Sequence, residues 1–182
     1  ATILAFSGKH DIADIDIGDM EKFGDYIEQH YFVNPTKSLL STVFPNSAYT
    51  QPRPKLETKQ RFLDVVVRGY RPETPKLQEP CVFTKRPAVM RIYREHAPLL
   101  ASATVSNFYP MGDAGLPVSG EVALALQALP LGSAPCGNRL VAVHSNHHEL
   151  LQDFARSFLQ ANRTQISLIE IQEIPDKEKK LP

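Results

Sequence analysis

The clearest helical pattern in the chain lies at 146–168 ("NHHELLQDFARSFLQANRTQISL"), where leucines and phenylalanines form one apolar stripe among polar residues. Apolar residues at this spacing fall on one face of an α-helix. Ser145 or Asn146 is expected to cap the helix, because Glu149 completes a capping-box pattern. The pattern therefore predicts a long amphipathic helix near the end of the chain.

Three weaker patterns also predict helices, at 19–32, 56–70 and 120–129. Asp19 is expected to cap the first and Ser119 the third, because short polar side chains accept hydrogen bonds from the free amides of a first turn. The second contains three consecutive valines, which are more typical of a strand.

Short β-prone runs predict strands at 2–6 ("TILAF"), 81–84 ("CVFT"), 91–95 ("RIYRE") and 139–145 ("RLVAVHS"). The run at 139–145 is the strongest of them, and 91–95 is expected to pair with 81–84. Few strands and several helices predict an α+β fold of mixed small sheets with packed helices.

Two loops combine prolines with polar residues: 44–54 ("FPNSAYTQPRP") and 107–120 ("NFYPMGDAGLPVSG"). Proline fixes φ while glycine permits positive φ, so loops of this composition have a defined shape. The proline-rich stretch 71–80 is expected to be a linker or an exposed loop.

Composition places the chain among globular proteins of the cytoplasm. Its 182 residues suffice for one domain with a subdomain, and 42% are hydrophobic. No apolar run approaches the length of a membrane span, no signal peptide is recognisable, and two cysteines without an export signal favour reduced thiols. Because the chain begins without Met and ends on the charged "DKEKKLP", we expect it to be part of a longer protein.

Charge is balanced overall but divided along the sequence. The formal net charge of zero argues against bulk affinity for nucleic acid. However, residues 1–30 hold seven acids and two lysines, a net of −5, whereas 53–94 hold eleven bases and four acids, a net of +7. Such a division predicts a basic face on a neutral protein, and the alternative is an ordinary solvated surface.

The two cysteines stand at half of a zinc-binding pattern. A structural zinc ribbon uses two CxxC pairs, whereas this chain has Cys81 with Thr84 and Ser133 with Cys136. Hydroxyl groups are poor zinc ligands, and two thiolates leave the ion half-coordinated. We therefore predict a degenerate zinc-ribbon-like pair of knuckles, in a subregion at about 80–140, that binds no metal or other cofactor.

No catalytic constellation is recognisable. His147 and His148 are adjacent in "HSNHHE", whereas helical metal ligands are typically spaced i, i+4. The serines lack a GxSxG elbow, and the 107–120 loop lacks the Gly-Lys ending of a phosphate-binding loop. The chain is therefore predicted not to be an enzyme.

The loops 44–54 and 107–120 carry side chains of the types that contact DNA bases or phosphates. Asn and Gln can bond base edges, while Ser and Arg can hold phosphates. The candidates are Asn46, Ser47, Gln51, Arg53 and Asn107. Packing against neighbouring subunits explains these loops equally well, so both interpretations stay open.

Three phrases together resemble one family: "FPNSAYTQP", "CVFTKRPAVMRIYREHAPLL" and "NFYPMGDAGLPVSGEVALALQALPLGSAPCGNRLVAVHSN". In this order, over about residues 44–165, the chain is similar to the large subunit of type I CRISPR effector complexes. The similarity is to the type I-B-like branch named for its CXXC–CXXC region. It covers the N-terminal domain of such subunits, which implies that residues 1–182 form that domain. Thr84 and Ser133 depart from the family's four cysteines.

The resemblance implies a non-catalytic role in antiviral defence. Such a subunit contacts guide RNA and other subunits of the Cascade complex, and recognises the protospacer-adjacent motif in double-stranded target DNA. It aids strand opening and recruits a helicase-nuclease or, in CRISPR-associated transposons, transposition proteins. We predict phosphate contacts from Lys85, Arg86, Arg91 and Arg94. The alternatives are a scaffold that binds only neighbouring Cascade subunits and a stand-alone metalloenzyme that uses His147 and His148.

Overall fold

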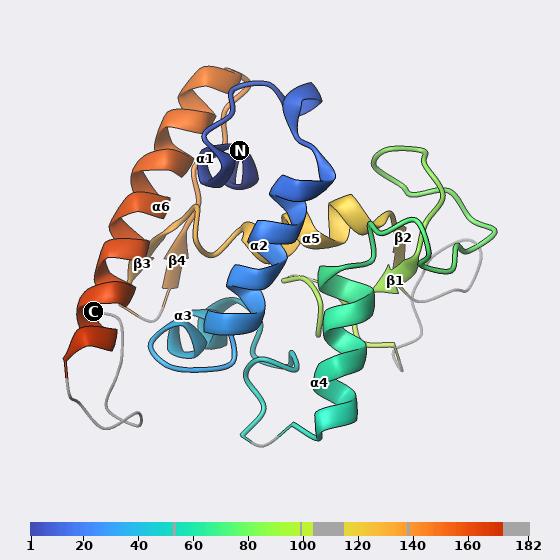
Figure 1. Cartoon of the computed structure of the whole chain (residues 1–182), viewed down its shortest axis with the longest axis horizontal. Coiled ribbons are helices and arrows are strands. Elements are labelled where there is room, and N and C mark those ends of the chain that lie inside the picture. The colour runs from blue at the N-terminus through green and yellow to red at the C-terminus, as the bar shows by residue number, and fades with distance from the viewer. Residues whose placement is uncertain (53, 99, 104–114, 138, 173–182) are drawn as a thin grey trace. The chain divides into compact units, whose positions relative to one another are not determined.

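The computed structural model describes residues 1–52, 54–98, 100–103, 115–137 and 139–172 (Figure 1). The chain divides into two compact units, unit 1 with residues 1–43 and 128–182 and unit 2 with residues 44–127. The sequence led us to expect one domain with a knuckle-like subregion at 80–140, and the boundary at 127/128 runs through that subregion.

Unit 1 is built mainly from helices. Its described elements are α1 (Thr2–Ser7), η1 (Ile12–Asp14), α2 (Ile17–His30), α3 (Thr36–Val43), β3 (Ala134–Cys136), β4 (Arg139–Val141) and α6 (His148–Ile171). Helix α1 lies against both α2 and α6, and β3 pairs with β4 in an antiparallel hairpin (Figure 1). The long helix α6 buries Ala155, Leu159, Asn162 and Ile166 at spacings of three and four residues, which confirms a helix here. Leu150 and Phe154 of the expected apolar stripe are exposed. The N-cap is His147 without a side-chain cap bond, so the predicted cap at Ser145 or Asn146 is wrong.

Residues 2–6 form a helix, so the strand predicted there is wrong. The β-branched Thr2 and Ile3 favour a strand locally, but tertiary packing decides the structure. Leu4 is buried, and the ring of Phe6 meets the ring of Phe23 edge-on at 4.9 Å between centroids. Helix α1 contacts both α2 and α6, so packing on more than one side favours a helix over the locally preferred strand.

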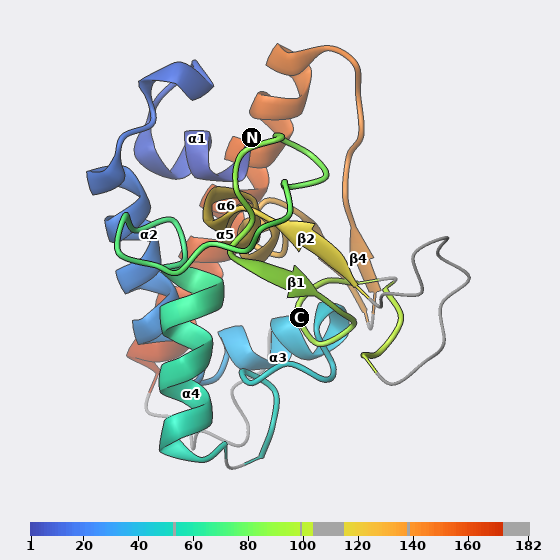
Figure 2. The same cartoon turned by 90° about the vertical axis from the view of Figure 1, so that its right-hand side faces the viewer.

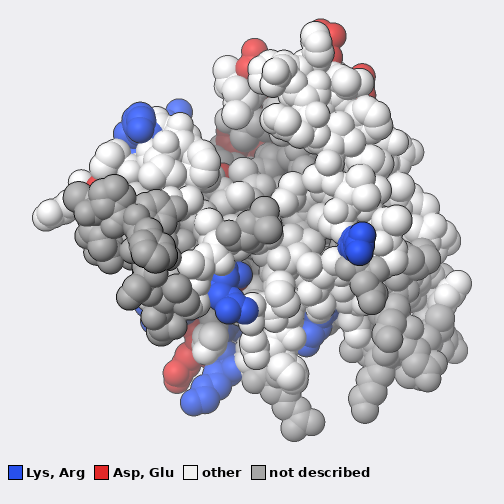
Figure 3. Space-filling view, turned by 180° about the vertical axis from the view of Figure 1, so that it is seen from behind, with Lys and Arg blue, Asp and Glu red and all other residues white. Residues whose placement is uncertain are grey.

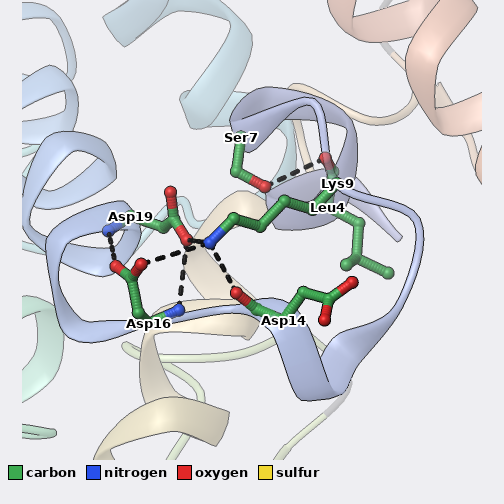
Figure 4. A network of polar contacts seen from close by, with 6 residues as sticks. All are labelled: Leu4, Ser7, Lys9, Asp14, Asp16 and Asp19. Carbon is green, nitrogen blue, oxygen red and sulfur yellow. Dashed lines mark hydrogen bonds and ion pairs between the residues drawn. The ribbon is translucent and has the colours of Figure 1, made fainter.

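Helix α2 begins two residues before the predicted start. Its N-cap is Asp16, whose carboxylate accepts from the Asp19 amide at 2.9 Å, while the Asp19 carboxylate accepts from the Asp16 amide at 3.1 Å. Asp19 is therefore the third residue of the helix, the N3 partner in the capping box, and not the cap itself. Lys9 donates to both carboxylates and to the carbonyl oxygen of Asp14, which ties the α1–α2 connection to the start of α2 (Figure 4).

Unit 2 holds one helix that changes its pitch, a two-stranded sheet and a second helix. Its described elements are α4 (Leu56–Phe62), the π-helical η2 (Leu63–Val67), β1 (Met90–Ile92), β2 (Leu116–Val118) and α5 (Gly120–Ala128), whose last residue falls in unit 1. The three valines of the predicted 56–70 helix lie in the π-helical turn. The predicted helix at 120–129 is confirmed as α5.

Strand β1 pairs with β2 in antiparallel register, Met90 opposite Val118 and Ile92 opposite Leu116 (Figure 2). The predicted pairing of 91–95 with 81–84 is wrong, because 81–84 is the turn of a hairpin. A Cβ on Gly120 would lie 2.0 Å from the Tyr70 amide nitrogen, so only glycine permits α5 to start this close to the residues after η2.

Strand β4 ends at Val141, so the strand predicted over 139–145 is real only in its first three residues. With helices and two small antiparallel sheets, the described residues have the α+β architecture that the sequence predicted.

Candidate nucleic-acid interface

The segment between residues 77 and 88 folds back on itself, and we call it the 77–88 hairpin (Figure 2). The amide of Leu77 donates to the carbonyl oxygen of Ala88 at 2.7 Å, and the amide of Ala88 donates to the carbonyl oxygen of Glu79 at 3.0 Å. Nearer the tip, the Cys81 amide donates to the carbonyl oxygen of Arg86 at 2.7 Å. These bonds hold the two arms together and leave the tip at residues 82–85.

The tip is a tight turn centred on the Cys81 thiol. The Lys85 amide donates to the Cys81 carbonyl oxygen at 3.0 Å, and Lys85 itself has a φ of 62°. Burial acts to raise the pKa of the Cys81 thiol, but hydrogen bonds from the Thr84 side chain and from the backbone amides of Thr84, Ser119 and Phe83 outweigh it and lower the pKa to about 7. The sulfur is therefore an acceptor for amides, the arrangement that a zinc knuckle gives its thiolate.

At the second predicted knuckle, the corner side chain of Ser133 bonds to the backbone. Ser133 is fully buried, and its hydroxyl donates to the Leu129 carbonyl oxygen at 2.8 Å. Cys136 is exposed at the end of β3, and Gly137 follows it with a φ of 57°. The positive φ after each corner, at Lys85 and at Gly137, is the backbone feature that both turns share.

No group of three or more His, Cys, Asp and Glu that could hold a metal ion exists within the described ranges of the chain. Cys81 and Thr84 belong to unit 2, whereas Ser133 and Cys136 belong to unit 1. His147 and His148 are exposed at the start of α6.

Of the four basic residues predicted to contact phosphates, Lys85 is the most accessible to a ligand. It is exposed, and no acidic side chain lies within ion-pair distance of it among the residues that the structure describes. Arg86 is 68% exposed and pairs with Glu121 at 3.1 Å. This exposed pair is weak enough for a phosphate to compete with it.

Arg91 is engaged inside unit 2, which corrects its assignment as a phosphate ligand. Its guanidinium lies 2.7 Å from the Glu79 carboxylate, donates to the Gly115 carbonyl oxygen at 3.3 Å, and is only 22% exposed. A phosphate contact would break these bonds. Arg91 therefore connects the 77–88 hairpin to the start of β2.

Asn46 and Arg94, predicted separately as a base reader and a phosphate ligand, lie in contact. With the amide oriented to satisfy both groups, Asn46 Oδ1 accepts from Arg94 Nη2 at 2.9 Å and from Nε at 3.2 Å. Both residues are exposed. The guanidinium fork fixes the amide and leaves its N–H₂ group as a donor.

The other loop residues predicted to contact nucleic acid differ in their exposure. Ser47 is fully buried, so its predicted contact with a groove or guide is wrong in this conformation. Gln51 is exposed. Arg53 and Asn107 lie outside the described residues.

Phe83 is the residue that sequence reasoning missed. It was assigned to a strand, where "CVFT" would bury alternate side chains, yet it is 61% exposed at the hairpin tip. The signal that could have located it is the series Phe83, Lys85 and Arg86 just after a thiol knuckle.

The two units carry opposite charge. Unit 2 has eleven Lys and Arg against seven Asp and Glu, a net of +4, and unit 1 has nine against thirteen, a net of −4. Figure 3 shows one face of the molecule, on which basic side chains stand at separate places among uncharged ones.

Protein-family models, curated proteins and solved structures were all compared with this chain, and none matches it. Within the described residues, no helix has the length and apolar character needed to cross a membrane.

Proposed function

We propose that this chain is a non-catalytic, DNA-recognising large subunit, or its N-terminal domain, of a type I CRISPR RNA-guided surveillance complex in the cytoplasm. It binds guide RNA and the other Cascade subunits, reads the protospacer-adjacent motif of duplex DNA, and passes the opened target to a helicase-nuclease or to transposition proteins. It uses no metal or cofactor.

The exposed Asn46–Arg94 pair is the observation that carries this proposal. Arg94 holds the Asn46 oxygen, so the amide presents a fixed donor. Donors of this kind recognise base acceptors such as purine N7 in the major groove or adenine N3 in the minor groove. Phosphate contacts from Lys and Arg side chains position a protein on DNA, and a fixed donor supplies a short readout, which together are what recognition of a brief motif requires.

Asn46→Asp tests the readout most sharply. The carboxylate keeps the contact with Arg94 and removes the donor, so the fold is preserved. We expect the full chain carrying this change to lose its preference among duplexes with randomised flanking motifs, by about 1–3 kcal/mol at the position read. Asn46→Ala should do the same. A preference profile equal to that of the unmodified protein in both variants would remove Asn46 from the proposal.

Salt dependence tests the phosphate contacts. We expect Lys85→Ala with Arg86→Ala to weaken binding to all duplexes and to lower the slope of log affinity against log salt by about one to two, because each phosphate contact contributes roughly 0.9. Lys22→Ala with Arg139→Ala is the matched control, since it removes two exposed charges from unit 1. Equal slopes in the two double variants would overturn the role of Lys85 and Arg86.

Two further results would favour the alternative functions. A full chain that fails to retard duplex DNA even at low salt, yet binds the other Cascade subunits, would be an interaction scaffold. Stoichiometric metal in the purified protein would favour the metalloenzyme.

A further inference from the structure

Phe83 is the most exposed aromatic side chain among the described residues of unit 2. Phe44, Tyr49, Phe62 and Tyr70 of the same unit are each at most 8% exposed, whereas Phe83 is 61% exposed and its neighbour Val82 is 39% exposed. An exposed large apolar side chain at a loop tip contributes nothing to a core. An exposed aromatic ring near basic side chains is informative, because the face of the ring is then available to a ligand.

The hairpin holds Phe83 rigidly. The cross-arm bonds of Cys81 and Ala88 fix both arms, and the Val82 amide donates to the Pro117 carbonyl oxygen at 3.0 Å, which anchors the tip to β2. The Cys81 thiol accepts from the Phe83 amide itself. Ordering this side chain on a ligand therefore costs only the freedom of its own two torsions.

The surroundings of Phe83 are cationic. Lys85 and Arg86 follow it, and the stretch 80–88 contains no Asp or Glu. Lys85 has no acidic partner within the described part of the chain. Phe83 and Lys85 lie two residues apart at the hairpin tip. An apolar ring and an ammonium group carried on one tip match a ligand that joins a flat ring to a phosphate.

We propose that Phe83 stacks on an unpaired base of a nucleic-acid strand while Lys85 binds the adjoining phosphate. This inference rests on the proposed function. Lys85 and Arg86 contact phosphates of paired and unpaired strands alike, and Phe83 adds a contact that only an unpaired base can make. A base that is paired within a duplex already stacks on its neighbours, so Phe83 distinguishes unpaired from paired strands.

The test compares three substitutions of Phe83 in the full chain. Phe83→Trp keeps a stacking face, Phe83→Leu keeps apolar bulk without one, and Phe83→Ala removes both. Each is measured with a single-stranded oligonucleotide that contains 2-aminopurine, whose fluorescence falls on stacking, and with a fully paired duplex of the same sequence. Urea midpoints confirm that the variants fold.

We expect Phe83→Leu and Phe83→Ala to weaken single-strand binding about tenfold and to abolish the fluorescence quench, while Phe83→Trp preserves both, because stacking on an aromatic side chain contributes roughly five- to a hundredfold per base. Duplex affinity should stay within about twofold in all three, since duplex contact depends on other residues.

Failure of this inference is distinguishable from failure of the proposed function. If Phe83→Leu binds and quenches as the unmodified protein does, while Lys85→Ala with Arg86→Ala still weakens duplex binding, the stacking role is overturned and the function stands. Equal losses on single strand and duplex would also overturn it, as would Phe83-dependent binding to anionic phospholipid vesicles without any effect on single strands. If the unmodified chain binds no nucleic acid, both proposals fall.

Discussion

Lys9 in unit 1 and Lys85 in unit 2 show two opposite uses of the same side chain. Lys9 donates to the Asp14 carbonyl oxygen and to the carboxylates of Asp16 and Asp19 (Figure 4). Lys85 stands at a hairpin tip, and among the described residues it has no acidic partner. The first ammonium group stabilises the fold, and the second is available to a ligand.

This difference extends to the units that contain them. Unit 1 is acidic, and its buried Asn162 amide donates to two carbonyl oxygens. Unit 2 is basic and presents Asn46, Phe83 and Lys85 at its surface. The overall net charge of zero conceals this division between the units. Whether a Lys or Arg side chain is available to a phosphate depends on whether an acidic group already pairs with it.

Loss of the Asn162 amide should produce the largest effect. Its Nδ2 donates to the carbonyl oxygens of Leu131 at 2.9 Å and Ser133 at 2.8 Å, and the residue is 3% exposed. Asn162→Ala leaves both acceptors buried and unpaired, so we expect a loss of about 2–3 kcal/mol in the free energy of unfolding. The measurement is urea unfolding.

Gln160→Ala, an exposed change on the same helix, is the control and should be close to neutral. A loss below about 0.5 kcal/mol in the free energy of unfolding of Asn162→Ala would contradict the stabilising role of the buried Asn162 amide.

Cys81→Ser should have a smaller effect that depends on pH. Because hydrogen bonds lower the thiol pKa from 9.0 to about 7 in the folded state, the thiolate stabilises the fold fully above the unfolded value and loses this contribution as pH falls through about 7. We expect the variant to match the unmodified protein at pH 6 and to be about 1 kcal/mol less stable at pH 9.

Urea midpoints at both pH values check this, with Cys136→Ser as the control for the exposed thiol. A Cys81→Ser deficit that is the same at both pH values would show that the thiolate does not hold the hairpin.

The smallest effect is expected from Asp19→Asn. The hydrogen bond from Lys9, followed by that from the Asp16 amide, lowers the pKa of Asp19, so its contribution is present above the unfolded value of 3.8 and is lost as pH falls through the lower folded value. We expect the variant to lose a little stability at pH 7 and to unfold in acid with a weaker pH dependence. Acid titration by circular dichroism measures this, and an unchanged acid transition would count against the network of Figure 4.

Local patterns predicted some elements well and failed where tertiary contacts decide. Helix α6 could be predicted because it is long enough for its apolar periodicity to be read, and α5 because strong helix formers such as Ala, Leu, Glu and Gln make up most of it. Helix α1 could not, since six residues beginning "TI" look like a strand until Leu4 and Phe6 meet α2 and α6.

The candidate site shows the same limit. Asn46 and Arg94 were each selected for their chemistry, but 48 positions separate them and no local pattern predicts their contact. Likewise, the pairing of Arg91 with Glu79 and the burial of Ser47 depend on how unit 2 folds. Side-chain chemistry can be read from sequence, whereas availability to a ligand is a property of the packed structure.

Ultraviolet cross-linking of the full chain to nucleic acid, followed by mass spectrometry of the linked peptides, tests the contrast between the units most directly. We expect cross-links within unit 2, at peptides that contain Asn46 and Phe83, with duplex and single-stranded probes respectively. Cross-links confined to unit 1, in the presence of intact binding, would contradict the assignment of nucleic-acid contact to the basic unit.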